Sequence, residues 1–280
     1  MTIQDIIKIL TDSGIEPNEA NVEVKMLLEH FANYGAKDII MGNKLTAEKL
    51  EIVKEKAELR AKTHQPIQHI IGFANFMGED FIVNPSVLIP RDETEILVRK
   101  AVEIINENNF KMALDVGTGS GCIACMVAKH TECQIIGLDI STDALNTALD
   151  NASRLNLFNK AIFRKSDIFS NVKPGESFDI IISNPPYIPP CEKANIQKEV
   201  TFDPENALFT TDENGLEFYE KITEGAPKIL NAKGFLIFEL GIGQAQDVKS
   251  IMEKNGFKDI EIIKDLAGIE RVISGCYIRE

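Results

Sequence analysis

The chain of 280 residues, 44% of them hydrophobic, is long enough to bury a sizeable core in one or two domains. Its 43 acidic and 30 basic residues give a formal charge of −13, which repels nucleic acid, and the sequence shows no basic patch. Five cysteines without framework spacing indicate a reducing compartment. The first residues do not resemble a signal peptide, and no apolar run approaches the ~20 residues of a membrane span. We therefore expect a soluble cytoplasmic protein.

Residues 1–70 predict a small helical N-terminal domain. Apolar residues recur at helical spacing in the stretches 6–10 and 24–31, and Thr46 is suited to cap a third helix. The mixed charges from Lys49 to Lys62 are interpreted as the solvated face of that helix. Residues 1–72 hold 9 basic and 11 acidic residues, a charge of −2 against −11 for the remainder, which supports a domain boundary.

Residues 71–84 predict a β-hairpin linker. Two short apolar runs flank a polar turn at 78–80. Farther along, Asp92 stands three residues before Glu95. This spacing is typical of a capping box and predicts a helix that continues to about Ile105.

Residues 85–280 predict an α/β domain, because strands and helices alternate from residue 112 onward. The expected strands are 112–116, 135–139, 161–165, 178–184, 235–240 and two final strands that start at Phe257 and Arg271. One expected helix starts near Ser120, another is capped by Ser141, and two more span 216–230 and 244–255. This alternation is typical of a mostly parallel sheet with helices on both faces. Cys122 and Cys125 lack a second metal-ligand pair and are expected to be packed helix residues.

The first strand of this domain ends in a glycine-rich turn that indicates a cofactor site. Its expected contact residues are Asp115, Gly117, Thr118, Gly119, Ser120 and Gly121. The glycines follow the pattern GxGxG, not the GxGxxG that holds a pyrophosphate, and alone they could form a simple tight turn. Asp139 ends the next strand, 22 residues after Gly117, where a carboxylate can accept from ribose hydroxyls.

Asp167 ends the third strand and could accept from an adenine amino group, although a helix cap or turn explains it equally well. Glycines and acids at successive strand ends fit a nucleoside without phosphate. S-adenosylmethionine suits this lining, and Asp115 can approach its ammonium group directly or through water.

Asn184, Pro185, Pro186 and Tyr187 follow the fourth strand and form the most informative motif of the chain. The Asn184 side-chain oxygen and the Pro185 carbonyl can accept the two hydrogens of a planar NH2 group, and Tyr187 offers a ring for stacking. Such a clamp aims a delocalised nitrogen lone pair at an electrophile. An ordinary Pro-Pro turn is the alternative. Next to a methyl donor, the clamp predicts N-methylation.

At this point the chain resembles the class I S-adenosylmethionine-dependent methyltransferases, and more narrowly the peptide-chain release factor glutamine N5-methyltransferases. The resemblance spans essentially the whole chain. Its motifs are DVGTGSG, SNPPYI, Gln65 to Gly72, FIVNPSVLIPRDETE at 81–95, DPENAL at 203–208, Gly215-Leu216, ELG with Gln244, and DLAG with Arg271. The NPPY motif alone is shared with adenine-N6 methyltransferases, whereas its combination with VNPxVLIPRxETE is highly specific.

The resemblance implies a Rossmann-like class I sheet and a substrate that is the glutamine of the Gly-Gly-Gln motif in release factors, with effects on translation termination. It implies that Asn184 and Pro185 bind the glutamine amide. The implied S-adenosylmethionine contacts are Gly117 to Gly121, Asp139, Asp167, Ile168 and Asn184, without a metal. The helical domain would extend the protein-binding surface, although a plain stabilising role is the alternative. The chain departs from the family at Ile168, where an aromatic is frequent, at Phe202-Asp203-Pro204, and at His69.

Three other functions remain as alternatives. An adenine-N6 methyltransferase acting on DNA or RNA would need a basic groove, which the charge of −13 disfavours. A non-catalytic S-adenosylmethionine-binding module would have no use for an amine clamp. A nucleotide oxidoreductase conflicts with the glycine spacing. A monomer is the default, with no direct contact to nucleic acid or membrane.

Overall fold

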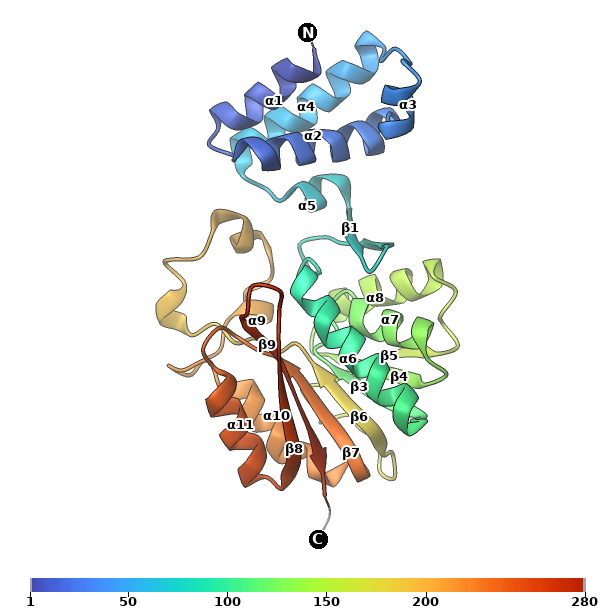
Figure 1. Ribbon diagram of the computed structural model, residues 1–280, viewed down its shortest axis with the longest axis vertical. Helices are drawn as coiled ribbons and strands as arrows, with labels where there is room; N and C mark the ends of the chain where they lie inside the picture. Colours follow the sequence, from blue (N-terminus) through green and yellow to red (C-terminus); the bar gives the residue numbers. More distant parts are fainter. Residues whose placement is uncertain (1, 279–280) are drawn as a thin grey trace. The chain divides into compact units, whose positions relative to one another are not determined.

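A seven-stranded sheet organises the larger of two units in the computed structural model, which describes residues 2–278 (Figure 1). The larger unit comprises Ala74–Ile196 and the described residues from Asp203 onward. The second, helical unit comprises the described residues up to Phe73 and, in addition, Gln197–Phe202. The return of 197–202 to the helical unit has no signal in the sequence.

The sheet is mostly parallel. Its strands are β3 (Met112–Val116), β4 (Gln134–Asp139), β5 (Ala161–Lys165), β6 (Phe178–Ser183), β7 (Leu230–Glu239), β8 (Phe257–Lys264) and β9 (Glu270–Tyr277). They lie in the order β5-β4-β3-β6-β7-β9-β8, with β9 antiparallel to both of its neighbours. The chain runs from β3 outward through β4 to β5 and then crosses to β6 on the other side of β3. The carboxyl ends of β3 and β6 therefore form the switch point at which such sheets bind ligands.

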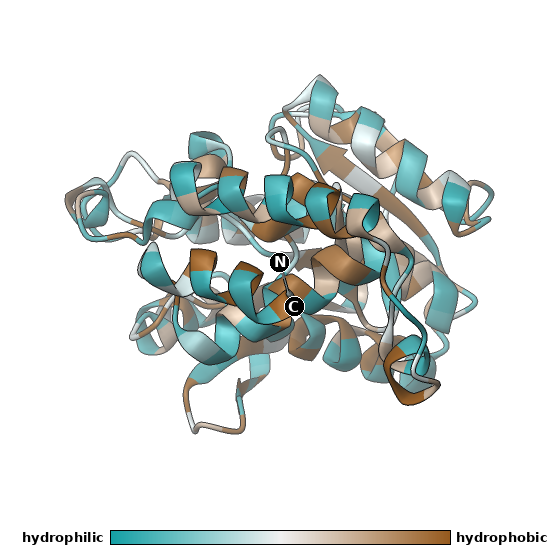
Figure 2. Ribbon diagram, turned by 90° about the horizontal axis from the view of Figure 1, so that it is seen from above, coloured by the Kyte–Doolittle hydropathy of each residue, from teal (hydrophilic) through white to brown (hydrophobic). Residues whose placement is uncertain are grey.

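Helices cover both faces of this sheet, as predicted. The helices are α6 (Asp92–Asn108), α7 (Cys122–His130) and α8 (Thr142–Arg154) on one face, and α10 (Glu217–Gly225) and α11 (Ala245–Lys254) on the other. Successive strand residues alternate between the faces: Ile180 and Ile182 pack in the α6–α7 core, and Ile181 packs in the α10–α11 core. Along the helices, brown hydrophobic residues alternate with teal hydrophilic ones, as burial of one side requires (Figure 2).

Three expectations about helices need correction. The helix expected over 216–230 ends at Gly225 and is followed by the short 3-10 turn η3 (Ala226–Lys228), which contains Pro227, so β7 already begins at Leu230. The capping box at Asp92 is also wrong, because Asp92 is the first helical residue and the N-cap is Arg91, which makes no side-chain cap. The helix from Ser120 begins at Cys122 after the left-handed Gly121.

The hairpin is present as β1 (Phe73–Phe76) and β2 (Glu79–Ile82). Its turn lies at Met77 and Gly78, both at positive φ, one residue earlier than predicted. Glu95 accepts from the Met77 backbone N–H at 2.7 Å. The carboxylate that was expected to cap a helix therefore holds the hairpin turn.

The helical unit contains α1 (Ile3–Asp12), α2 (Pro17–Ala32), α3 (Ala36–Ile40), α4 (Ala47–Thr63) and α5 (Ile67–Ile71). The apolar residues predicted to form its core, including Ile6, Leu10, Val24 and Leu27, are buried against one another. Thr46 caps α4 by accepting from the Lys49 N–H, as predicted. The remaining short elements are η1 (Pro190–Glu192), η2 (Lys198–Phe202) and α9 (Glu205–Leu208).

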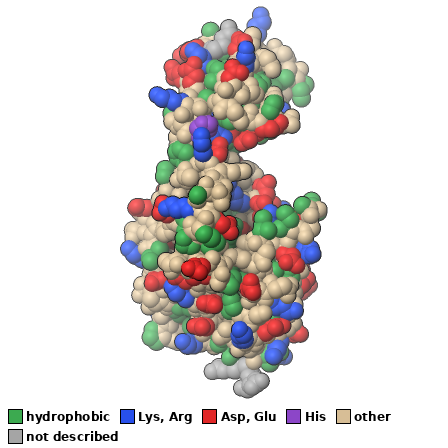
Figure 3. Space-filling view, turned by 90° about the vertical axis from the view of Figure 1, so that its left-hand side faces the viewer, with side chains coloured by type: hydrophobic (Ala, Val, Ile, Leu, Met, Phe, Trp, Pro, Cys, Tyr) green, Lys and Arg blue, Asp and Glu red, His purple; other side chains and the backbone are tan. Residues whose placement is uncertain are grey.

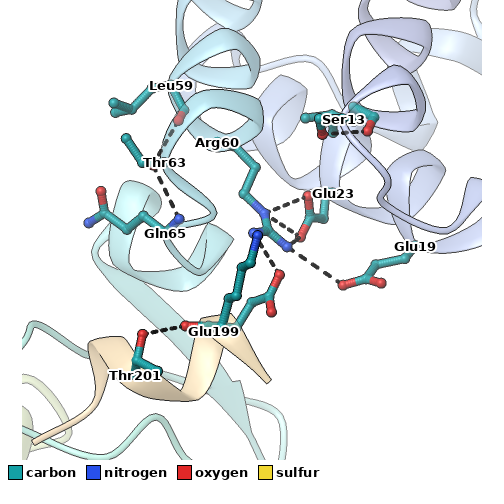
Figure 4. A network of polar contacts seen from close by, with 11 residues as sticks. Ser13, Glu19, Glu23, Leu59, Arg60, Thr63, Gln65, Glu199 and Thr201 are labelled. Carbon is teal, nitrogen blue, oxygen red and sulfur yellow. Dashed lines mark hydrogen bonds and ion pairs between the residues drawn. The ribbon is translucent and has the colours of Figure 1, made fainter. Parts of the chain in front are cut away.

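The interpretation of Lys49 to Lys62 as a solvated helix face is wrong at Arg60, because only 1% of the surface of Arg60 is exposed. Its Nε donates to both carboxylate oxygens of Glu23 at 3.0 and 3.1 Å, and Nη1 donates to Glu199 at 3.1 Å (Figure 4). Glu19 lies farther away, at 3.7 Å. The guanidinium therefore connects α2, α4 and η2 within the helical unit and retains a segment that arrives 139 residues later in the chain.

Arg60→Met should destabilise the helical unit by about 3–5 kcal/mol, because it leaves the Glu23 carboxylate buried without its cation. The double variant Arg60→Met/Glu23→Leu should recover most of this loss, since it removes the orphaned charge as well. Urea unfolding followed by circular dichroism measures both effects. Equal losses in the single and double variants would contradict the interpretation.

Candidate active site

A cavity of about 280 Å³ lies at the carboxyl ends of β3, β4, β5 and β6. Among the residues predicted to form the site, it is lined by Gly117, Gly119, Asp139, Asp167, Ile168, Asn184, Pro185 and Pro186. Asp115, Thr118, Ser120, Gly121 and Tyr187 do not line it. The parallel strands all end at this edge, so loops that are distant in the sequence together enclose one cavity.

The glycine loop leaves open space beside the cavity because it lacks side chains. Gly117 and Gly119 adopt φ values of 76° and 53°, and a Cβ atom at either position would meet no atom within 4 Å. Gly121 serves another purpose: a Cβ atom there would lie 2.9 Å from the Cβ of Ala148. The first two glycines therefore leave room for a ligand to approach the backbone, and the third allows close packing onto α8.

Asp115 is completely buried behind the glycine loop. One of its oxygens, Oδ2, accepts from the Thr118 hydroxyl at 2.6 Å, while Oδ1 has no hydrogen-bond partner among the described residues. Burial raises the pKa of Asp115 to about 7. A buried oxygen without a donor is rare in proteins, and an ammonium group or a bridging water would satisfy it.

Asp139 holds the loop from the second strand. Its carboxylate accepts from the Gly119 N–H and the Ser141 N–H, each at 2.9 Å, and burial raises its pKa. The Ser141 hydroxyl caps α8, as predicted. Asp139 thus both shapes the glycine loop and lines the cavity.

The Asp167–Ile168 turn forms the next wall. Ile168 has a φ of 47°, a left-handed conformation that is strained for a β-branched residue and that is characteristic of functional sites. The Ser166 hydroxyl donates to the Ile168 carbonyl at 2.8 Å and accepts from the Asn171 N–H, which stabilises the turn. Asp167 itself is exposed at the cavity rim.

Asn184 belongs to a buried chain of polar side chains. Its Nδ2 donates to the Thr94 hydroxyl at 3.3 Å, and that hydroxyl donates to Glu239 Oε2 at 2.6 Å. Glu239 is 3% exposed, and burial raises its pKa to about 7. Because the Asn184 NH2 group is used in this way, its oxygen is the group left to face a ligand.

Tyr187 closes the far end of the same loop. Its ring packs against the α10–α11 core, and its backbone carbonyl accepts from Gln244 Nε2 at 3.1 Å. Gly215 and Gly241 make this packing possible, because a Cβ atom at Gly215 would lie 2.2 Å from the Tyr187 carbonyl oxygen. The loop 184–187 is therefore braced at both ends, by Thr94 at one and Gln244 at the other.

Several site residues were missed as individual contributors. Thr94 and Glu239 hold Asn184, and further residues that line the cavity include Ser86, Val87, Leu88, Pro204, Asn206, Ala207, Phe218, Lys221 and Ile222. Glu239 carried a usable signal, since it ends a strand at the edge where Asp115 and Asp139 also lie. Thr94 lies in the quoted motif at 81–95, but as one threonine within a helix it indicated no contact with Asn184.

The lining of the cavity fits S-adenosylmethionine, the nucleoside joined to an amino acid that the sequence analysis predicts. The cavity combines apolar walls with acids at two strand ends, a glycine loop with open space, and an acidic oxygen without a hydrogen-bond partner among the described residues, close behind that loop.

In residues 2–278 no helix has both the length and the apolar character that a membrane span requires. Acidic and basic side chains are interspersed on the face that Figure 3 presents.

Comparisons with known proteins match this chain to methyltransferases. Residues 92–213 match the family described as methyltransferase small domain. A release factor glutamine methyltransferase of Bacteroides thetaiotaomicron is 39% identical over 86% of this chain and 84% of its own length. One of Geobacter sulfurreducens is 36% identical over 95% of this chain and 92% of its own length.

The fold is also similar to that of solved structures. The crystal structure of a methyltransferase from Pyrococcus furiosus superposes with a TM-score of 0.54 and 20% sequence identity. The superposition covers 73% of this chain and 91% of that one. At this identity the similarity concerns the fold alone.

Asp115→Asn should stabilise the ligand-free protein increasingly as the pH rises from about 4 to about 7. The raised pKa means that the folded state disfavours the carboxylate, so the wild type loses stability over this interval, by up to roughly 4 kcal/mol. Urea unfolding at a series of pH values measures the difference. Asp143→Asn on the exposed side of α8 controls for the loss of one charge, and a pH-independent difference would contradict the prediction.

Proposed function

The chain belongs to the release factor glutamine methyltransferase family and transfers a methyl group from S-adenosylmethionine to the side-chain nitrogen N5 of a release-factor glutamine; on this premise we propose which of its residues do so. The cavity at the ends of β3 to β6 receives the cofactor, and the loop Asn184–Tyr187 receives the glutamine. The observation that carries the proposal is the orientation of Asn184, whose NH2 group is bound to Thr94. The target glutamine is that of the Gly-Gly-Gln motif, whose methylation modulates translation termination.

Cofactor binding is assigned to three strand ends. Gly117 and Gly119 allow the ligand to approach the backbone, and Asp139 accepts from the ribose hydroxyls. Asp167 and Ile168 contact the adenine. Asp115 attracts the ammonium group, directly or through water. Thr118 acts from behind the loop through its hydrogen bond to Asp115, and Gly121 acts through its packing on α8. The Ser120 carbonyl accepts from Asn151 of α8 and so also holds the loop from behind.

S-adenosylmethionine, when bound, supplies an electrophilic methyl group and would leave as S-adenosylhomocysteine once the bond from its sulfur to that methyl group breaks. The protein orients the nucleophile: Asn184 Oδ1 and the Pro185 carbonyl accept the two amide hydrogens of the substrate glutamine. Both acceptors become more effective as positive charge grows on that nitrogen. Orientation of this kind can contribute ~7–11 kcal/mol to lowering a barrier.

Pro186 and Tyr187 are assigned to shaping the glutamine pocket. Pro186 lines the cavity, and the packed Tyr187 ring gives the loop a rigid end close to the amide plane. The mechanism needs no strong base before attack, because the nitrogen becomes far more acidic once it carries the methyl group. Its proton then passes to water. The mechanism also requires no metal ion.

The proposal extends to the wider behaviour of the chain. The helical unit adds protein-binding surface for the release factor. We further propose a cytoplasmic monomer without direct nucleic-acid contacts; the formal charge of −13 supports the last point.

Methyl transfer from radiolabelled cofactor tests the function directly. Purified release factor should be labelled, whereas its Gly-Gly-Gln variant with Gln→Ala and duplex DNA should not. Labelling of the Gln→Ala variant would place the reaction at another residue. Labelling of DNA would favour the adenine-N6 alternative.

Asn184→Ala should reduce kcat by at least about 100-fold while the cofactor Kd changes little, because the substitution removes one acceptor of the clamp. Single-turnover methylation and calorimetric cofactor titration measure the two quantities. Asn108→Ala, near the end of α6, is the matched control and should retain full turnover. Near-native turnover of Asn184→Ala would rule out the clamp.

A further inference from the structure

Thr94, Asn184 and Glu239 come from α6, the loop after β6 and the end of β7, and together they form one hydrogen-bonded chain. The distances are 3.3 Å from Asn184 Nδ2 to Thr94 Oγ1 and 2.6 Å from Thr94 Oγ1 to Glu239 Oε2. Thr94 and Glu239 are each 3% exposed. Buried contacts of this kind have defined donors and acceptors, so the direction of each bond can be worked out.

The direction follows from the single proton of a hydroxyl group. A carboxylate only accepts, so Thr94 must donate its proton to Glu239. The Thr94 oxygen can then only accept from Asn184, which must present its NH2 group to Thr94. The Asn184 oxygen is consequently the atom that faces the cavity.

We propose that Glu239 and Thr94 are positioning residues that fix the amide orientation of Asn184 and thereby make the site select glutamine over glutamate. This inference rests on the proposed clamp. An asparagine amide has nearly the same shape when it is flipped by 180°, so packing alone does not choose between the two orientations. The hydrogen-bonded chain supplies that choice.

The two orientations have opposite chemical consequences. With the oxygen facing the cavity, Asn184 and the Pro185 carbonyl present two acceptors, which bind a carboxamide NH2 and repel a carboxylate. With the NH2 facing the cavity, Asn184 would donate toward the nitrogen lone pair that must attack. The flipped site would also accept the carboxylate of glutamate.

The surroundings of Glu239 make the hydrogen bonds among Glu239, Thr94 and Asn184 sensitive to protonation of the Glu239 carboxylate. Charged or titratable groups near it are Glu93 on α6, Cys122 on α7, Arg271 on β9, and Tyr187 and Tyr219. The Tyr219 hydroxyl donates to the Glu239 backbone carbonyl at 2.9 Å. Burial raises the pKa of Glu239 to about 7. Once protonated, Glu239 would donate to Thr94, and Thr94 could then donate to the oxygen of a flipped Asn184. Turnover at saturating cofactor should therefore decrease as the pH is lowered from about 7.

Four variants of the full chain test the inference. Thr94→Val removes the hydroxyl, and Thr94→Ser keeps it. Glu239→Gln removes the carboxylate that dictates the direction of the two hydrogen bonds. Thr223→Val is the matched control, because its hydroxyl is also buried in a helix but has no hydrogen-bond partner among the described residues. Methylation of release factor in single turnover gives the rate, and calorimetry gives the cofactor Kd.

We expect Thr94→Val and Glu239→Gln to lower the single-turnover rate by about 10- to 100-fold, with KM for release factor and the cofactor Kd within about 2-fold of wild type. Thr94→Ser and Thr223→Val should remain within about 3-fold of the wild-type rate. The decrease in turnover at acidic pH should be absent in Glu239→Gln. That variant should also bind the Gln→Glu release factor more tightly than the wild type does, by about 10-fold.

Two results would overturn the inference. One is a Thr94→Val or Glu239→Gln rate equal to that of Thr223→Val, and the other is unchanged discrimination against the Gln→Glu release factor in Glu239→Gln. If Thr94→Val fails to fold, the pH profile of wild type and the Thr94→Ser rate still decide the question. Absence of methylation by the wild-type enzyme would instead refute the proposed function, so the two failures are distinguishable.

Discussion

The pairing of β3 with β6 is the constraint on which the site depends. Val116 and Ser183 are register partners at the last residues of the two strands, and the Ser183 hydroxyl donates to the Val116 carbonyl at 2.7 Å. The glycine loop and the Asn184 loop therefore leave the sheet side by side, although 67 residues separate them in the chain. A shift of this register by one residue would turn the strand side chains to the opposite face and separate the two halves of the site.

The site contains groups that oppose folding. Asp115 and Glu239 are buried acids whose pKa values are raised to about 7, Asp115 Oδ1 has no hydrogen-bond partner among the described residues, and Ile168 adopts a left-handed φ of 47°. Such costs persist only where the rest of the fold is stable enough to impose them. Here the two apolar layers on either side of the sheet supply that stability. The concentration of these unfavourable features at one edge is itself a sign of function.

Local rules predicted the helix caps correctly where no distant partner competed. Thr46 and Ser141 cap helices as expected, because each needs only backbone groups three residues away. Glu95 failed the same test, since the Met77 N–H of the hairpin takes its carboxylate. Arg60 was misjudged for a related reason: its partners Glu23 and Glu199 lie 37 and 139 residues away. Pairings at such separations leave no trace in a local pattern.

The sequence by itself determined the alternation of strands and helices, the glycine loop, the NPPY motif and the family resemblance, because hydrophobic period and short motifs are written in consecutive residues. It also indicated that Asp139, Asp167 and Asn184 would meet, since parallel strands end at one edge. Only the tertiary structure decided which way Asn184 points and which predicted residues line the cavity. The reason is physical: a side-chain amide takes its orientation from partners on other elements, and here Thr94 and Glu239 lie 90 residues before it and 55 residues after it in the chain.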